Sequence, residues 1–289
     1  MTTAIRIRGL TKTYGTHRAV DDLDLDVHEG EVFAFLGPNG AGKTTVVEIL
    51  EGFRTRDAGE VSVLGTDPHR APRAWRDRIG IVLQSTGGLD LLTPREILRS
   101  TSRAYSTPRD VEEVIVATGL TEKADARISG LSGGQRRRLD VALGIVGRPE
   151  LLFLDEPTTG FDPQARRDFW DLIRGLAGGG TTILLTTHYL DEAEHLADRV
   201  GVIAAGRLLA LDTPAALGGR QSQEATVSWE EGGVRHTVRT AEPTAEVARL
   251  AARFPGEVPE LTVTRPSLED TYLGLIAPHV SDATEEVLA

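Results

Sequence analysis

Five short, almost continuously apolar runs, separated by helical patterns, constrain the fold of this chain more than any other feature. In the intervening stretches KTTVVEILEGF and QARRDFWDLIRGLA, apolar residues recur every three or four positions, which indicates amphipathic helices. Strands that are apolar on both sides and alternate with helices are typical of a largely parallel sheet covered on both faces. We therefore predict an α/β fold. The predicted strands are 31–36, 78–84, 150–155, 181–188 and 199–206.

Two further regions complete the predicted main domain, which spans 1–219. Residues 4–10 and 23–32 alternate apolar with charged side chains, and this predicts an antiparallel sheet with one solvated face. Over about 85–131 no strand is evident, and two helical patterns that begin near prolines predict a helical insert.

The C-terminal part of the chain has a different pattern. A hairpin that turns at 231–233, then a helix, a short strand and a second helix, predict a small separate α+β domain over 220–280. Residues 281–289 are predicted to form a flexible tail. Two roles remain open for the small domain, which are stabilising the subunit and regulating dimerisation.

Composition narrows the class of protein. The 289 residues carry 32 basic and 43 acidic side chains, a net charge of −11, which argues against general nucleic-acid binding because such binding needs a basic face. The absence of cysteine excludes disulfides, zinc–thiolate sites and cysteine nucleophiles. No signal peptide is evident, and the apolar runs are far shorter than the roughly 20 residues of a membrane helix. We expect a soluble cytoplasmic protein whose membrane role, if any, depends on a partner.

The stretch GPNGAGKTT at 37–45 matches the phosphate-binding pattern G-x-x-x-x-G-K-[ST] and lies between a predicted strand and a predicted helix. Its glycines let successive backbone N–H groups face a phosphate at the positive end of the helix. Lys43 would bridge the β- and γ-phosphates, and the Thr44 hydroxyl would bind Mg²⁺. The alternative is a glycine-rich turn that binds nothing. The candidate nucleotide-binding residues are Gly37, Pro38, Asn39, Gly40, Ala41, Gly42, Lys43, Thr44 and Thr45.

Two core strands end in residues suited to hydrolysis. Asp155 would hold Mg²⁺ at the end of LLFLDEP, and Glu156 would polarise the attacking water. His188 ends ILLTTH at the same predicted sheet edge. The alternatives are a solvated turn before Pro157 for the two carboxylates and a structural role for the histidine.

A second anion-binding pattern, LSGGQ, occupies 131–135 immediately before a basic helical run. The basic run Arg136–Arg138 could indicate nucleic-acid binding. On so acidic a chain, we interpret it as a solvated helix face or as local salt bridges.

Together these motifs resemble the nucleotide-binding subunit of ABC transporters over about 1–215, and LSGGQ is the signature of that family. The resemblance implies a P-loop NTPase core, ATPase activity, and ATP and Mg²⁺ as cofactors. It also implies that Tyr14 stacks on adenine, that Gln84 senses Mg²⁺ and the γ-phosphate, and that Asp162 lies in a loop crossing a dimer interface. The alternative for Tyr14 is an ordinary surface tyrosine, and the alternative for Gln84 is a side-chain amide that caps a backbone group. Phe161 departs mildly from the family, which most often has leucine there.

The resemblance also explains why one chain carries two anion-binding patterns. Two copies of such subunits pack head to tail, so that each ATP lies between the loop of one and the signature of the other. The chain is therefore expected to form a homodimer with two shared sites. The residues that would complete the partner's site are Ser132, Gly133, Gly134 and Gln135.

Transport would require a separate membrane permease, and the resemblance places its contact at about 84–105. The ending RPSLEDTYLGL is similar to that of drug-export ATPases of the daunorubicin-resistance type. This implies a motor subunit on the cytoplasmic face of the membrane for export of drugs, antibiotics or lipid-like compounds. The alternatives are a soluble ABC-type ATPase acting on ribosomes or DNA and a nucleotide-gated regulatory module.

Overall fold

A computed structural model of the protein describes residues 2–82 and 89–285. The chain divides into two compact units, Met1–Leu211 and Asp212–Ala289, whereas the boundary predicted from the sequence lies after 219. Gln84, one of the predicted site residues, lies outside the described residues.

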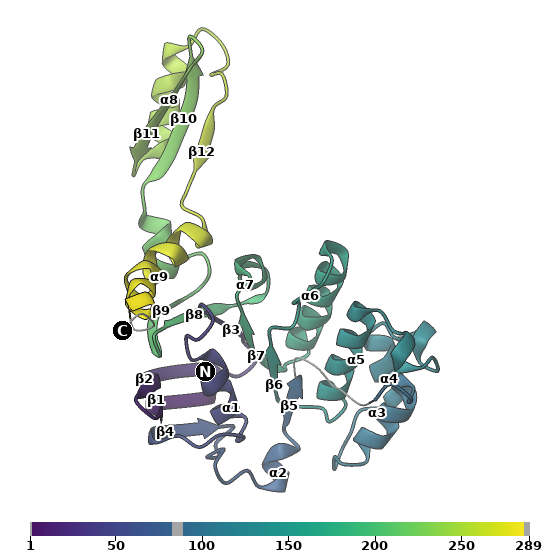
Figure 1. Ribbon diagram of the computed structural model, residues 1–289. Helices are drawn as coiled ribbons and strands as arrows, with labels where there is room; N and C mark the ends of the chain where they lie inside the picture. The colour runs from purple at the N-terminus through teal and green to yellow at the C-terminus, as the bar shows by residue number, and fades with distance from the viewer. Residues whose placement is uncertain (1, 83–88, 286–289) are drawn as a thin grey trace. The chain divides into compact units, whose positions relative to one another are not determined.

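The core of the first unit is a six-stranded sheet in the order β5-β6-β7-β3-β8-β9 (Figure 1). Strand β3 runs parallel to both β7 and β8, and β6 runs parallel to both β5 and β7. All of its strands except the edge strand β9 are mostly buried, as the apolar runs predict, and the α/β fold is confirmed. The strands are β3 (Val32–Leu36), β5 (Ile79–Val82), β6 (Leu151–Asp155), β7 (Thr182–Thr187), β8 (Arg199–Ala204) and β9 (Arg207–Asp212).

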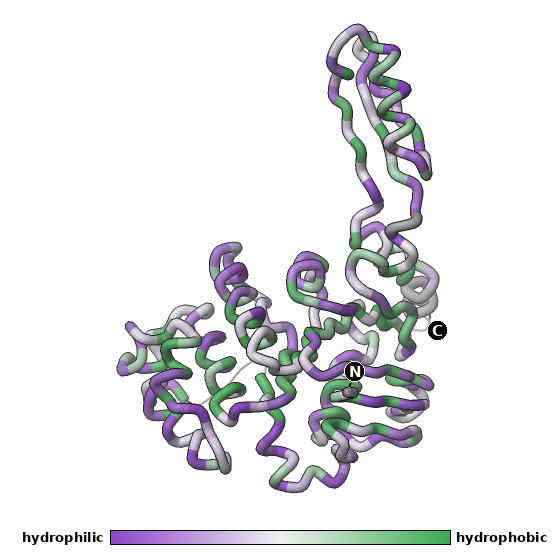
Figure 2. The backbone as a smooth tube through the Cα atoms, turned by 180° about the vertical axis from the view of Figure 1, so that it is seen from behind, coloured by the Kyte–Doolittle hydropathy of each residue, from purple (hydrophilic) through white to green (hydrophobic). Residues whose placement is uncertain are grey.

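A three-stranded antiparallel sheet in the order β2-β1-β4 packs on this core. Its strands alternate hydrophilic and hydrophobic residues (Figure 2), so that one face is buried and the other is solvated. The buried side chains of this sheet join Phe33 and Phe35 of β3 in one apolar cluster. The strands are β1 (Thr3–Tyr14), β2 (His17–His28) and β4 (Ala58–Val63).

Helices follow the core strands, and their starts position the candidate site. Helix α1 begins at Lys43, within the phosphate-binding pattern, α6 follows β6, and α7 follows β7. Helices α6 and α7 contact each other. The bounds are α1 (Lys43–Leu50), α2 (Arg73–Arg76), α6 (Pro163–Gly178) and α7 (Leu190–Leu196).

The predicted helical insert consists of α3 and α4 together with the 3₁₀ turns η1 and η2, and it packs against α5. These helices gather at one side of the first unit (Figure 1). The bounds are α3 (Pro94–Ser102), α4 (Val111–Ala117), η1 (Thr121–Lys123), η2 (Ile128–Gly130) and α5 (Gly133–Ile145).

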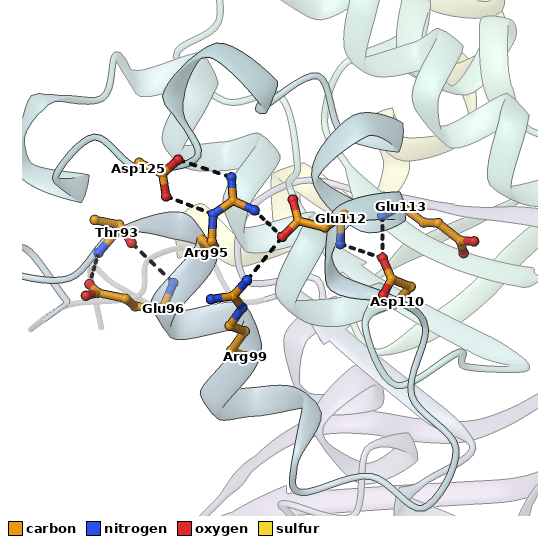
Figure 3. Close-up of polar contacts among 8 residues, drawn as sticks. All are labelled: Thr93, Arg95, Glu96, Arg99, Asp110, Glu112, Glu113 and Asp125. Atoms are coloured by element: carbon orange, nitrogen blue, oxygen red, sulfur yellow. Dashed lines mark hydrogen bonds and ion pairs between the residues drawn. The ribbon is translucent and has the colours of Figure 1, made fainter.

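Charged and capping contacts join the parts of this helical region (Figure 3). The Arg95 guanidinium on α3 donates to both carboxylate oxygens of Asp125, at 2.8 and 3.1 Å, and also pairs with Glu112 on α4. Thr93 and Glu96 form a capping box at the start of α3, and the Asp110 side chain caps α4.

The second unit contains an antiparallel sheet in the order β11-β10-β12, with α8 packed on β10. Its small core is formed by Val227, Trp229, Leu250 and Val258. Helix α9 continues to Glu285, into the segment for which the sequence predicts a flexible tail. The bounds are η3 (Leu217–Ser222), β10 (Ala225–Glu231), β11 (Val234–Thr240), α8 (Pro243–Arg253), β12 (Thr262–Thr264) and α9 (Leu268–Glu285).

None of the helices within residues 2–82 and 89–285 combines the length and hydropathy that a membrane crossing requires.

Candidate nucleotide-binding site

The loop between β3 and α1 has a backbone that only glycine can adopt at two positions. Gly42, the N-cap of α1, has φ of 102°, and a Cβ there would lie 2.3 Å from the carbonyl oxygen of Ala19. A Cβ on Gly37 would lie equally close to the carbonyl oxygen of Ile203. At these two positions glycine therefore lets the loop pack directly against the backbone at Ala19 and Ile203.

Lys43 is the first residue of α1, and its side chain turns back over the loop. Its ammonium donates to the carbonyl oxygens of Gly37 at 2.7 Å and Pro38 at 3.1 Å, and only 7% of the residue is exposed. Burial lowers the pKa of Lys43, although the charges of Glu156 and Asp155 oppose this shift. The loop thus holds a cation at the place where a phosphate would need one.

A cavity of about 320 Å³ opens above this loop. Glu156 and the residues of the first β-hairpin line it together with the loop, so the structure brings Tyr14 and the phosphate-binding residues to one place. The cations of Lys12 and Arg54 lie 5.5 and 5.4 Å from the centre of the Tyr14 ring, and Tyr14 is 38% exposed. The lining residues are Tyr14, His17, Ala19, Asn39, Gly40, Ala41, Gly42, Lys43, Thr44, Thr45 and Glu156.

The end of β6 carries Asp155 and Glu156. The Thr186 hydroxyl donates to Asp155, and the Glu156 N–H donates to both the carbonyl and the hydroxyl of Thr186 at 3.1 Å each. Glu156 has φ of 42°, an uncommon conformation for a residue with a side chain, and these bonds hold it there.

His188, after the end of β7, contacts this carboxylate. Its Nδ1 lies 3.3 Å from the Glu156 Oε1. The His188 side chain is 39% exposed and that of Glu156 is 19% exposed, so the pair stays open to solvent on the side of the histidine.

The signature segment forms a capped helix start. The Ser132 hydroxyl accepts from the Gln135 N–H at 3.3 Å, and the Gln135 side chain accepts from the Ser132 N–H at 3.0 Å. Among the described residues, 132–135 do not line the cavity above the phosphate loop. Asp162 is likewise a helix cap, because its side chain accepts from the Gln164 and Ala165 N–H groups at 2.9 Å each.

The sequence interpretation missed the role of Arg137. Arg136 pairs with Asp90 and Arg138 with Asp168, as the interpretation of local salt bridges predicts. Arg137 is buried instead, and its guanidinium donates to the carbonyl oxygens of Pro157 at 2.9 Å and Asp155 at 2.8 Å. It thereby joins α5 to the end of β6. The helical period contains the signal, because positions 141 and 145 on the same face are apolar.

The residues present fit ATP and Mg²⁺. The loop at 39–45 lines a cavity, and Lys43 at its end supplies a charge that matches a phosphate chain. The Thr44 hydroxyl and the Asp155 carboxylate offer oxygen ligands, which Mg²⁺ prefers.

A glycine-rich loop of the phosphate-binding pattern between a buried strand and a helix, with Glu156 from the end of β6 lining the same cavity, defines a P-loop nucleotide-binding protein. The comparisons agree. A family model described as ABC transporter matches residues 20–159. The daunorubicin resistance ATP-binding protein DrrA2 of Streptomyces coeruleorubidus is 39% identical over 98% of this chain and 97% of that protein. The Nod factor export ATP-binding protein I of Rhizobium meliloti (strain 1021) is 45% identical over 74% of this chain and 65% of that protein.

A solved structure extends the likeness to three dimensions. The cbiO1 protein of Clostridium perfringens, described as part of the ABC transporter complex cbiONQ, has a TM-score of 0.67 and 25% identity over 74% of this chain and 90% of its own. The chain belongs to the ATP-binding proteins of ABC transporters, and it is an ABC ATPase.

Proposed function

We propose that this chain is the motor subunit of a membrane exporter, that it hydrolyses ATP as a head-to-tail homodimer, and that it works with a separate permease. The observation that carries the proposal is the position of Glu156. Its carboxylate lines the cavity above the phosphate loop and lies 3.3 Å from His188.

In the proposed reaction, the phosphate loop binds and orients the ATP phosphates, and Lys43 balances their charge. Glu156 accepts the proton of the attacking water, and His188 orients that carboxylate. Mg²⁺ would be held by Thr44 and Asp155, with Gln84 as a further proposed ligand, and it would neutralise developing charge on the phosphates. Tyr14 provides the surface on which adenine stacks.

We propose the dimer because, among the described residues, the signature segment is absent from the lining of the cavity. The signature segment 132–135 does not line it within the described residues, although the start of α5 is suited to an anion. A second copy placed head to tail would bring Ser132 and the glycine N–H groups to the phosphates. Asp162 lies on the same proposed interface.

The test of the hydrolytic role is Glu156→Gln. This substitution keeps the shape of the side chain and removes the base, so ATP binding should persist while phosphate release falls roughly 10²- to 10⁴-fold. Glu60→Gln, which alters an exposed carboxylate on β4, is the matched control. Turnover at the normal rate by Glu156→Gln would contradict the assignment. If the unmodified chain binds ATP without releasing phosphate, it is a nucleotide-gated regulatory module instead.

The shared site is tested by mixing two inactive variants. Lys43→Ala removes the loop cation, and Ser132→Arg blocks the signature. In a head-to-tail dimer of one copy of each, one site combines the intact loop of the Ser132→Arg copy with the intact signature of the Lys43→Ala copy. The mixture should therefore recover hydrolysis, about a quarter of the normal rate if pairing is random and the sites act independently. A mixture as inactive as its components would contradict a shared site.

The export role rests on the relatives and on the predicted permease contact at 84–105. Leu91 is 78% exposed and Leu92 is 37% exposed, which leaves apolar surface for a partner beside α3. The chain would then act on the cytoplasmic face of the membrane, and drugs, antibiotics or lipid-like compounds are the proposed cargo. Co-purification with a multispan protein from native membranes should weaken in Leu91→Asp and persist in Val116→Asp, a control on α4 that is 65% exposed. Co-purification with ribosomes or DNA would contradict the role.

A further inference from the structure

A fully buried carboxylate, that of Glu192 on α7, lies close to the Glu156–His188 pair. The residue has 0% exposure, and within the described residues neither carboxylate oxygen makes a hydrogen bond of full geometry. Burying such a group costs free energy unless nearby donors compensate. Its position therefore calls for a reason beyond packing.

Three side chains that can donate hydrogen bonds lie near this carboxylate. Burial raises the pKa of Glu192, and the hydroxyls of Thr187 and Thr158 and the indole N–H of Trp170 oppose that rise. The Thr158 hydroxyl and the Trp170 N–H make no other hydrogen bond within the part of the chain that the structure describes. Two buried donors and a buried acceptor, the Glu192 carboxylate, thus lie in one region of the fold without other hydrogen-bond partners among the described residues.

The donors come from the segments that carry the proposed hydrolytic pair. Thr158 follows Glu156 by two residues, and Thr187 directly precedes His188. Glu192 is therefore placed between the end of β6 and the end of β7 on the side of α7.

A second set of contacts reaches the same histidine. The Arg166 guanidinium on α6 lies 4.7 Å from the ring centre of Tyr189, and this ring lies 4.1 Å from that of His188. Arg166 also lowers the pKa of Glu192 by its charge. The histidine is thus supported from α6 as well as from α7.

We propose that Glu192 is a positioning residue for hydrolysis: it holds the segments 156–158 and 187–189 in register and thereby sets the contact between Glu156 and His188. The inference rests on the proposed roles of that pair. A displacement of about 1 Å at a reacting group can cost about 100-fold in rate, so a residue that touches no substrate can still control turnover.

The first experiment compares Glu192→Leu with Glu192→Gln in the full-length chain. Leucine fills the space without accepting hydrogen bonds, so kcat should fall roughly 10- to 100-fold while KM for ATP stays within about twofold. Glu192→Gln keeps a hydrogen-bond acceptor, so its decrease in log kcat should be at most half of that caused by Glu192→Leu. Asp191→Leu, which alters an exposed carboxylate on the same helix, is the control and should leave kcat unchanged. A Glu192→Leu enzyme with kcat within about twofold of normal would contradict the proposal.

The second experiment separates positioning from general stability. In a His188→Ala background the contact is already lost, so Glu192→Leu should lower the residual rate by less than about threefold. A loss as large as in the normal background would contradict the proposal. If Glu192→Leu does not fold, Thr158→Val can replace it, because this substitution removes one donor at nearly constant volume. Its effect on kcat is then compared in the normal and His188→Ala backgrounds, and the same threefold limit applies.

These results are separable from those on the proposed function. Normal turnover by Glu156→Gln contradicts the hydrolytic assignment. Normal turnover by Glu192→Leu, with Glu156→Gln inactive, contradicts only the role of Glu192.

Discussion

The starts of α1 and α5 are the two helix N-termini that the sequence assigns to an anion, and they use their backbone N–H groups differently. Helix α1 begins at Gly42, whose left-handed conformation provides no side-chain cap. Helix α5 begins at Ser132 in a capping box with Gln135. The first start lines a cavity beside Glu156, whereas the second belongs to the helical region.

The difference supports the proposal that the loop at 37–45 serves the chain's own site and that the signature segment serves the site of a second copy. A capped start satisfies its own donors, so α5 holds its conformation without a ligand. An uncapped start that carries a buried lysine leaves its donors for phosphate. The two starts therefore suit opposite sides of one shared nucleotide, one as the binding loop and the other as a preformed surface.

Removing the cation at the start of α1 should have the largest effect. Lys43→Ala deletes a buried charge that faces the phosphates, so ATP affinity should fall roughly 100-fold or more. Titration with a fluorescent nucleotide measures the loss, and Lys123→Ala in η1 serves as the control. Affinity within about threefold of normal would mean that the backbone N–H groups alone account for phosphate binding.

The C-terminal end of α1 carries a buried carboxylate, that of Glu51, and its titration should have the next largest effect, on the stability of the fold. Burial raises the pKa of Glu51 to about 8, and the charges of Asp155 and Glu48 add to the rise. Its protonated form stabilises the fold fully below the unfolded pKa of about 4.5, and that contribution is lost as the pH rises through about 8. Glu51→Gln does not ionise, so from about pH 5 to pH 8 it should gain stability over the normal chain, on the order of 2 kcal/mol.

Urea unfolding across this pH range measures the gain. Glu60→Gln is again the control, and the difference between its stability and that of the normal chain should not change with pH in the same way. A pH-independent difference for Glu51→Gln would show that Glu51 is ionised in the folded protein.

The cap of α5 can be compared with a second capping box in the same helical region. Ser132→Ala and Thr93→Ala should each lower the free energy of unfolding by about 1 kcal/mol, because each removes a helix cap. Only Ser132→Ala should also lower ATP hydrolysis, since only this serine is proposed to reach a phosphate. Equal effects of both variants on hydrolysis would mean that Ser132 acts through helix stability alone.

The smallest effect concerns the ion pairs that support the helical region. Arg95→Ala should lower the free energy of unfolding only slightly, since its partners are largely exposed and solvent weakens the ion pairs. Arg99→Ala removes a single contact of 3.4 Å to Glu112 and should cost less. Equal losses in urea unfolding would show that the paired bonds from Arg95 to Asp125 add nothing.

Much of this architecture could be predicted because its signals are local. Apolar runs mark buried strands wherever a strand is covered on both faces, and the turn at 231–233 has two glycines in left-handed conformations. The loop at 37–45 could be recognised because its glycines are required by the backbone itself. Strand β9 and helix α2 were not predicted, since a half-buried strand and a four-residue helix carry little periodic signal.

The misses in the site have a common physical cause. Arg137, Glu192 and Glu51 are charged side chains that the fold buries, and charge in a sequence is usually interpreted as exposure. Their surroundings are set by contacts between segments far apart in the chain, such as Arg137 with the carbonyl oxygen of Pro157. The prediction that 132–135 serves a site in a second copy came from the family resemblance, because no spacing within the chain indicates it.

The phosphate loop is also joined to the strands around it. The Gly206 N–H donates to the Ala41 carbonyl at 3.1 Å, and the Gly206 carbonyl accepts from the Asp21 N–H at 3.0 Å, so the loop is linked to β2 through the turn before β9. Tyr14 stands on β1, the hydrogen-bonded neighbour of β2. A tilt of this antiparallel sheet would therefore be transmitted to the loop, so the two proposed contacts with the nucleotide, Tyr14 on the base and the loop on the phosphates, are mechanically coupled.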